Sequence, residues 1–267
     1  MKRIIKLLLL FFAYQLAVTA VFTGLFMLWN RSVVLPDPNS SYYITFLLIV
    51  QVAFSVFLSV HLLAGGYVKL DARRSLSQTP PYLWLLFLLL IVGLGLWNNF
   101  LNELADLPNT NKVFLASMMQ HPLGIVATVI LAPIMEELLF RGAMQGYLLR
   151  KWKSPLWAIL MASFLFGAVH GNPAQIPFAF CIGVGLGWVY YKTKNLLACM
   201  FMHLLNNGSA VLVYWLSDQT DATLIDSLGM KWALGLAMLG VMLTILGIVG
   251  IEKYSRNKTV LWHEQPE

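Results

Sequence analysis

Long apolar runs recur along this chain and limit the folds that it can adopt. A helix needs about 20 apolar residues to cross the roughly 30 Å hydrocarbon core of a bilayer. Runs of about that length recur along the chain, and lipid tolerates only helices or closed barrels because every backbone polar group must be bonded internally. The sequence therefore predicts an all-α, polytopic membrane helical bundle with about eight transmembrane helices, near 5–29, 42–68, 82–97, 122–149, 156–171, 173–191, 195–216 and 232–251.

The composition excludes a soluble protein. Hydrophobic residues make up 59% of the chain, charged residues only 11%, and the mean hydropathy is +0.72. Soluble domains are nearer half apolar and a quarter charged. The net charge of +6 is not accompanied by a basic, aromatic-interleaved patch or a nucleic-acid module. We therefore expect the lipid bilayer as a partner and no nucleic acid.

The basic residues are distributed unevenly over the predicted loops. With the N-terminus in the cytoplasm, the opposite side receives only Arg31, Lys112 and Lys231. An excess of Lys and Arg marks cytoplasmic loops, so the N-terminus and the C-terminus are both predicted to be cytoplasmic. The cytoplasmic side would hold Lys2, Arg3, Lys6, Lys69, Arg73, Arg74, Arg150, Lys151, Lys153, Lys192, Lys194, Lys253, Arg256 and Lys258.

The chain is predicted to be one membrane domain, 1–267, without an internal repeat or a soluble module. Its beginning, MKRIIK followed by LLLLFFAYQLAVTA, is similar to a signal peptide, but the apolar run continues to Trp29, which favours an uncleaved first helix. Cys181 and Cys199 lie in different segments without metal or redox spacing, so we expect reduced packing residues.

Two adjacent carboxylates stand inside the fourth predicted span. Ionisable residues there cost roughly 2.5–3.5 kcal/mol each and are functional candidates by default. Glu137 and Arg141 are i and i+4 and can form an ion pair, whereas Glu136 has no partner on its own helix and suits a general base. The alternative is a solvated helix end, but the apolar run continues to Leu149. Pro133 is expected to kink the helix beside Glu136 and to admit water.

Three polar residues on later segments complete the set of candidates. His170 closes the fifth segment, and His203 and Asn207 are i and i+4 in the seventh, so they share a face. Taken alone, an intramembrane histidine is more often a packing residue, and His61 is interpreted in that way. Glycines allow the helices to approach closely: Gly142 and Gly146 in the fourth segment, and Gly183, Gly185 and Gly187 in the sixth.

These residues form three motifs in order. EELLFR at 136–141 has the form EExxxR, FGAVH at 166–170 has the form FxxxH, and HLLNN at 203–207 contains HxxxN. The set resembles the CPBP intramembrane proteases, the CAAX-processing and bacteriocin-processing group that includes the Abi family and the Rce1-type prenyl-protein endopeptidases. The resemblance covers roughly 122–216, which is the predicted catalytic core. It implies hydrolysis of a peptide bond within the bilayer.

The resemblance also implies roles for individual residues. Glu136 would activate water with help from His170, and His203 with Asn207 would stabilise the oxyanion. Glu137, Arg141 and Phe166 would support the site. The family is described as metalloproteases, and two histidines with a glutamate are a legitimate zinc set, here Glu136, His170 and His203. The chain lacks HExxH, and the same residues can act without metal, so we favour chemistry without a metal or other cofactor.

Two other functions are compatible with the composition. A non-catalytic scaffold that binds hydrophobic or lipidated peptides could keep the fold, although it would be free to lose a motif residue. A proton-coupled transporter is disfavoured because no two-fold repeat is visible. The substrate is expected to be a hydrophobic or membrane-associated peptide: a prenylated CAAX peptide, a bacteriocin leader or a regulatory membrane protein. The short loops favour a prokaryotic plasma membrane.

Overall fold

The structure is a computed structural model, and it describes residues 1–34, 37, 40–217, 223–256 and 262. Within these residues the regular elements are all helices. The first part of the chain forms α1 (Lys2–Asn30), α2 (Ser41–Ala64), α3 (Ala72–Ser77), α4 (Pro81–Ala105) and α5 (Lys112–Gln120).

A continuous helical run then extends from Pro122 to Lys151. It consists of α6 (Pro122–Ile125), the π-helix η1 (Val126–Leu131), α7 (Ala132–Glu136), the π-helix η2 (Glu137–Gln145) and α8 (Gly146–Lys151). The remaining helices are α9 (Pro155–Ala168), α10 (Gln175–Thr193), α11 (Leu196–Leu216), α12 (Leu224–Leu228) and α13 (Met230–Ser255).

The polytopic helical bundle is confirmed. In the described part of the chain, six helical segments are long and apolar enough to cross a membrane: α1, α2, α4, the run from Pro122 to Lys151, α11 and α13. The other two predicted spans are also helical. Of these, α9 is only 14 residues long, and α10 has 19 residues but is less apolar because it contains glycines, tyrosines and Lys192.

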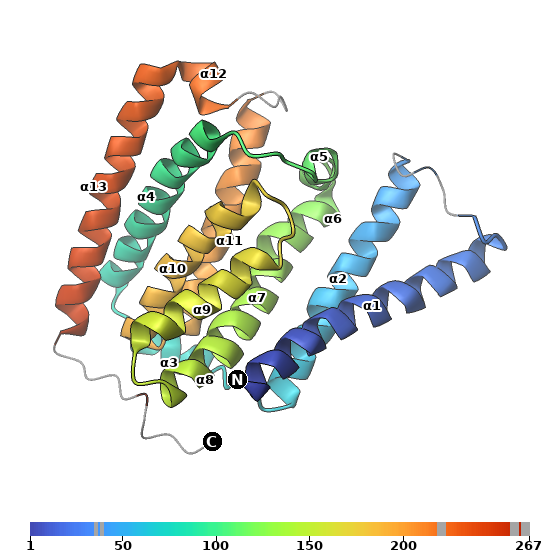
Figure 1. Ribbon diagram of the computed structural model, residues 1–267, viewed down its shortest axis with the longest axis horizontal. Coiled ribbons are helices and arrows are strands. Elements are labelled where there is room, and N and C mark those ends of the chain that lie inside the picture. Colours follow the sequence, from blue (N-terminus) through green and yellow to red (C-terminus); the bar gives the residue numbers. More distant parts are fainter. Residues whose placement is uncertain (35–36, 38–39, 218–222, 257–261, 263–267) are drawn as a thin grey trace.

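The helices pack in pairs around the central run. Figure 1 shows α4 beside α13 at one edge of the bundle and the α1–α2 hairpin at the other, with α9, α10 and α11 next to the run in the middle. The start of α1 and the end of α13 lie at the same end of the bundle, together with α3 and α8. This arrangement agrees with two termini on one side of a membrane, and which side that is stays a prediction.

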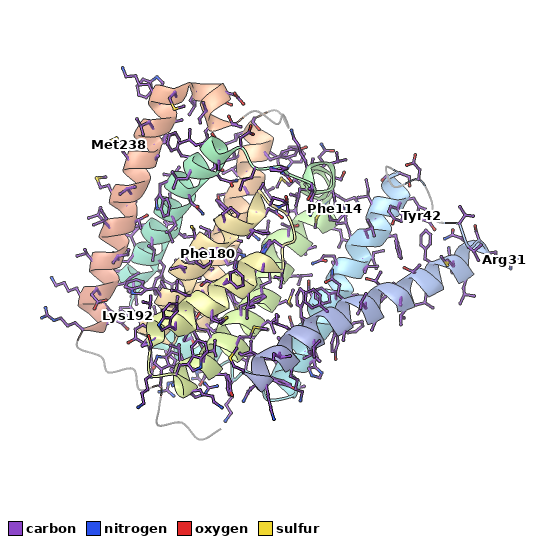
Figure 2. The ribbon with its side chains drawn as sticks, in the orientation of Figure 1. Arg31, Tyr42, Phe114, Phe180, Lys192 and Met238 are labelled. Carbon is purple, nitrogen blue, oxygen red and sulfur yellow. The ribbon has the colours of Figure 1, made fainter. Side chains whose placement is uncertain are left out.

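The outer surface of the bundle is apolar, as expected for contact with lipid. Met238, labelled on the outward face of α13 in Figure 2, is 67% exposed, and Leu16 on α1 is 72% exposed. The interior holds one large cluster of buried apolar side chains that includes residues of every predicted span. Burial is greatest in η2, where every residue from Glu137 to Gln145 is buried.

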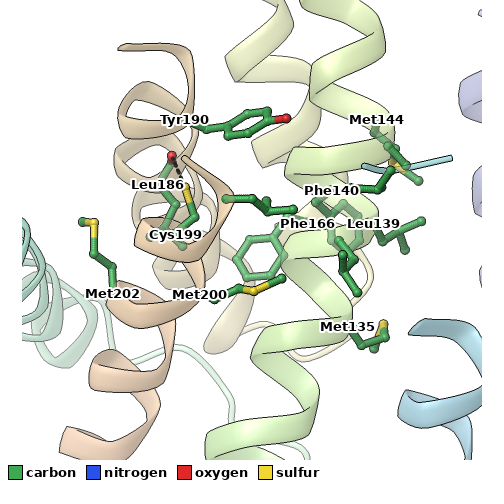
Figure 3. Close-up of a cluster of buried hydrophobic side chains, with 14 of the residues drawn as sticks. Met135, Leu139, Phe140, Met144, Phe166, Leu186, Tyr190, Cys199, Met200 and Met202 are labelled. Atoms are coloured by element: carbon green, nitrogen blue, oxygen red, sulfur yellow. Dashed lines mark hydrogen bonds between the residues drawn. The ribbon is translucent and has the colours of Figure 1, made fainter. Parts of the chain in front are cut away.

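His61 and Cys199 lie outside the motifs and have structural partners. The Nδ1 atom of His61 lies 3.0 Å from the hydroxyl of Tyr14, and its ring stacks on Tyr67, which is the packing role expected for it. Both cysteines are free, as predicted; Cys199 is buried and Cys181 is partly buried. The thiol of Cys199 donates to the carbonyl of Leu186 at 3.5 Å (Figure 3).

Candidate active site

The two glutamates lie at the junction of α7 and the π-helix η2, with Glu136 ending α7 and Glu137 beginning η2. π-helices are rare and occur mostly at functional sites, and here η1 and η2 lie on either side of the single α-helical turn of α7. Sequence reasoning predicted a kink at Pro133. The structure shows π-helical turns on both sides of α7: the N–H of Ala132 donates five residues back to Ala127, and the N–H of Gly146 donates five residues back to Arg141.

Glu137 and Arg141 form the predicted ion pair. Nη1 of Arg141 donates to Oε1 of Glu137 at 2.8 Å, and both side chains are almost fully buried. Arg141 also donates from Nη2 to the carbonyl of Gly183 on α10 at 3.2 Å. A Cβ added at Gly183 would lie 3.3 Å from that Nη2 atom. The absence of a side chain at Gly183 therefore lets the guanidinium reach the backbone.

His203 on α11 joins the two glutamates. Its Nδ1 atom lies 2.9 Å from Oε1 of Glu137, and its Nε2 atom lies 3.6 Å from Oε2 of Glu136. The imidazolium form can donate from both nitrogens, and with Arg141 it would balance the charge of the two carboxylates. Glu137 thus orients the ring, and the opposite nitrogen faces Glu136.

Glu136 differs from Glu137 in its surroundings. Its side chain is 18% exposed, whereas that of Glu137 is fully buried. Consecutive helical residues point about 100° apart, which places one carboxylate in the protein interior and leaves the other partly accessible. The sequence predicted from spacing that the two carboxylates lie in different environments, and the two exposures agree with that; the role of each carboxylate stays a prediction.

Phe166 contacts both His170 and His203. Its ring lies edge-to-face with the rings of His170 and His203, at centroid distances of 5.1 and 5.5 Å. The guanidinium of Arg141 lies over the Phe166 ring at 4.4 Å. Figure 3 shows Phe166 together with Phe140 in the packed interior. His170 lies in the turn after α9, and its Nδ1 atom is 2.8 Å from the carbonyl of Phe166. His170 therefore contacts Phe166, which in turn contacts His203 and Arg141.

Asn207 lies one helical turn after His203 on α11. Its Nδ2 atom donates to the carbonyl of Thr128 in η1 at 2.9 Å, and its Oδ1 atom accepts from Asn206 at 3.1 Å. A Cβ added at the neighbouring Gly208 would lie 3.6 Å from Val129, so α11 and η1 are in close contact here. The amide of Asn207 is thus held at both of its ends.

The zinc alternative needs Glu136, His170 and His203 around one ion. Within the residues that the structure describes, no three His, Cys, Asp or Glu side chains are grouped closely enough to hold a metal ion. Instead, Nδ1 of His203 faces Glu137 and Nδ1 of His170 faces a backbone carbonyl. This arrangement does not fit the alternative zinc set.

Sequence reasoning missed Gln145, one turn after Arg141. This side chain is fully buried, and its Nε2 atom donates to the carbonyl of Gly187 at 2.7 Å. Gln145 and Arg141 therefore bind α10 at carbonyls one helical turn apart. The spacing of Glu137, Arg141 and Gln145 at i, i+4 and i+8 was the signal that could have found it.

Comparison with known proteins agrees with the motifs. Residues 118–209 match the family model described as type II CAAX prenyl endopeptidase Rce1-like. This segment is therefore similar to the Rce1-like family. It contains all seven predicted site residues and overlaps the predicted core 122–216. The residues concerned are Glu136, Glu137, Arg141, Phe166, His170, His203 and Asn207.

Two curated bacterial proteins are similar to the chain over part of its length. YdiL of Bacillus subtilis, named as a candidate membrane peptidase, is 32% identical over 92 residues, or 34% of this chain and 37% of YdiL. The membrane-embedded CAAX protease MroQ of Staphylococcus aureus is 29% identical over 117 residues, or 42% of this chain and 47% of MroQ. The chain spans less than half the length of both relatives. No solved structure gives a significant match.

Proposed function

We propose that this protein is a membrane endopeptidase that cleaves a hydrophobic or membrane-associated peptide. The observation that carries the proposal is the position of His203, whose two ring nitrogens face Glu137 at 2.9 Å and Glu136 at 3.6 Å. A buried carboxylate that orients a histidine, with a second and more accessible carboxylate on its other side, is a group suited to proton transfer. The Rce1-like match of residues 118–209 supports the same activity.

The proposed chemistry begins at Glu136. Its carboxylate takes a proton from a water molecule, and the resulting hydroxide attacks the carbonyl carbon of the scissile peptide bond. The negative charge that develops on the carbonyl oxygen is stabilised by N–H donors of His203 and Asn207. The carbon–nitrogen bond then breaks, and the proton held by Glu136 passes to the leaving amine. His170, which lies beside Phe166, assists Glu136 in activating the water.

The substrate class is proposed from the apolar surroundings and from the relatives. The site residues lie on segments that are predicted to be embedded in lipid, so a peptide must reach them from the membrane or its surface. MroQ is named as a CAAX protease. A prenylated CAAX peptide, a bacteriocin leader and a regulatory membrane protein all share the required hydrophobic character.

The test compares protein termini in membranes that contain the wild type or Glu136→Gln. Glutamine keeps the size of the side chain but cannot accept the proton, so new termini should disappear while the protein stays inserted. Glu252→Gln is the matched control, because Glu252 is exposed and pairs with Lys192 at the far end of α10 and α13. Identical termini in wild-type and Glu136→Gln membranes would contradict proteolysis and favour a non-catalytic scaffold.

The same assay tests the role of a metal. We expect cleavage to continue in the presence of a chelator, because Nδ1 of His203 faces the carboxylate of Glu137 and Nδ1 of His170 faces the carbonyl of Phe166. Activity that is lost in the chelator and restored by added zinc would show that the metal-free mechanism is wrong.

A further inference from the structure

The backbone beside Glu136 contains a carbonyl group that its own helix does not satisfy. In η1 the hydrogen bonds run five residues back, as in the bond from the N–H of Ala132 to the carbonyl of Ala127. The next bond of this ladder would run from residue 133 to the carbonyl of Thr128. Residue 133 is a buried proline and has no N–H. The ladder is therefore interrupted at Thr128.

Asn207 occupies the place of the missing donor. Its Nδ2 atom donates to the carbonyl of Thr128 at 2.9 Å, from a helix 79 residues away in the sequence. A carbonyl inside a protein is destabilising without a hydrogen-bond partner, so this bond satisfies the backbone as well as holding the amide. The Nδ2 atom carries two hydrogens. One is used for Thr128, and the second is left for another acceptor.

We propose that Pro133 is a positioning residue for Asn207. Because it has no N–H, it frees the carbonyl of Thr128, and that carbonyl fixes the orientation of the Asn207 amide. The bond between Asn206 and Oδ1 of Asn207 holds the other end of the amide. The second Nδ2 hydrogen is then held ready for the oxyanion. This last step rests on the proposed function, whereas the link between Pro133 and Asn207 does not.

A double-mutant cycle on stability tests the link without any assay of activity. Asn207→Leu should lower the unfolding temperature in the wild-type background, because the carbonyl of Thr128 loses its partner. In a Pro133→Ala background the restored N–H can donate to that carbonyl, so the same Asn207→Leu substitution should lower the unfolding temperature less. Equal losses in both backgrounds would overturn the proposal. If Pro133→Ala cannot be recovered, Pro133→Ser restores the same N–H and replaces it in the cycle.

A second measurement tests the positioning role. With an internally quenched peptide as substrate, Pro133→Ala should lower kcat by about ten-fold or more and leave KM unchanged, since losing one oxyanion donor costs roughly 100-fold to 1000-fold. The unfolding temperature should not fall, because alanine suits a helix interior better than proline. A structural role alone would instead change stability and spare kcat.

The matched control is Pro155→Ala. Pro155 occupies the first turn of α9, where the backbone N–H has no partner within the helix, so kcat should stay at the wild-type value. A wild-type kcat in Pro133→Ala would overturn the positioning role. If Glu136→Gln also remains active, the proposed function fails, and the stability cycle still decides whether Pro133 and Asn207 are linked.

Discussion

Glu137 and Arg141 illustrate what residue spacing can and cannot predict. Their separation of four residues predicted an ion pair on one helix face, and the pair has a distance of 2.8 Å. The bond from His203 to the same Glu137 oxygen was not predicted, because it joins residues 66 positions apart. Spacing within a helix follows from helix geometry, but a contact between helices depends on how the bundle packs.

The burial of this pair leads to a prediction about stability. Glu137→Leu would leave the buried guanidinium of Arg141 without its carboxylate, which costs about 3–5 kcal/mol for a buried pair. The unfolding temperature in detergent should therefore fall strongly, and Glu136→Gln should change it little because Glu136 is partly exposed. The double substitution Glu137→Leu with Arg141→Met removes both charges and should recover part of the loss. A double variant no more stable than Glu137→Leu would contradict this account.

At the scale of the helices, the sequence predicted where segments lie better than their internal geometry. The apolar runs and the glycines could be read from the sequence, and the predicted glycines lie at close contacts between helices, as at Gly142 and Gly187. The π-helical register of η1 and η2 was not predictable from periodicity, because it accompanies hydrogen bonds to other helices: Arg141 in η2 donates to the carbonyl of Gly183 in α10, and Asn207 in α11 donates to the carbonyl of Thr128 in η1. Pro133 was noticed, but its consequence depends on a donor from a different helix.

The contact between α4 and α13 allows a prediction with a control on the same helix. A Cβ at Gly93 would lie 2.6 Å from the carbonyl oxygen of Gly240 and from the backbone nitrogen of Thr244, and neither backbone atom can move away alone. Gly93→Ala should therefore force the helices apart and cost about 1–3 kcal/mol. At Gly95 an added Cβ meets nothing within 4 Å, so Gly95→Ala should not lower the unfolding temperature. Equal unfolding temperatures for both variants would show that this contact is not tight.

For the whole molecule, the sequence predicted an all-helical membrane bundle from its apolar runs, and the structure confirms it. The number of complete spans was harder to predict. The segment 156–171 was predicted as a span, but α9 ends at Ala168 and has 14 residues, or about 21 Å of helix at 1.5 Å per residue. A short helix of this kind can be buried among its neighbours without crossing the bilayer alone.

The orientation in the membrane is a prediction of the charge distribution alone. Anionic lipids and the positive-inside rule favour the basic end of the bundle, which carries α3, α8 and the end of α10, on the cytoplasmic side. In a variant with Cys181 and Cys199 replaced by alanine, a new cysteine at Ser77 or Ser32 reports each side, because both positions are exposed. A membrane-impermeant maleimide added to spheroplasts should label Ser32→Cys at once and Ser77→Cys only after permeabilisation. The reverse pattern would place the basic end outside and contradict the prediction, because Ser32 lies beyond the far end of α1.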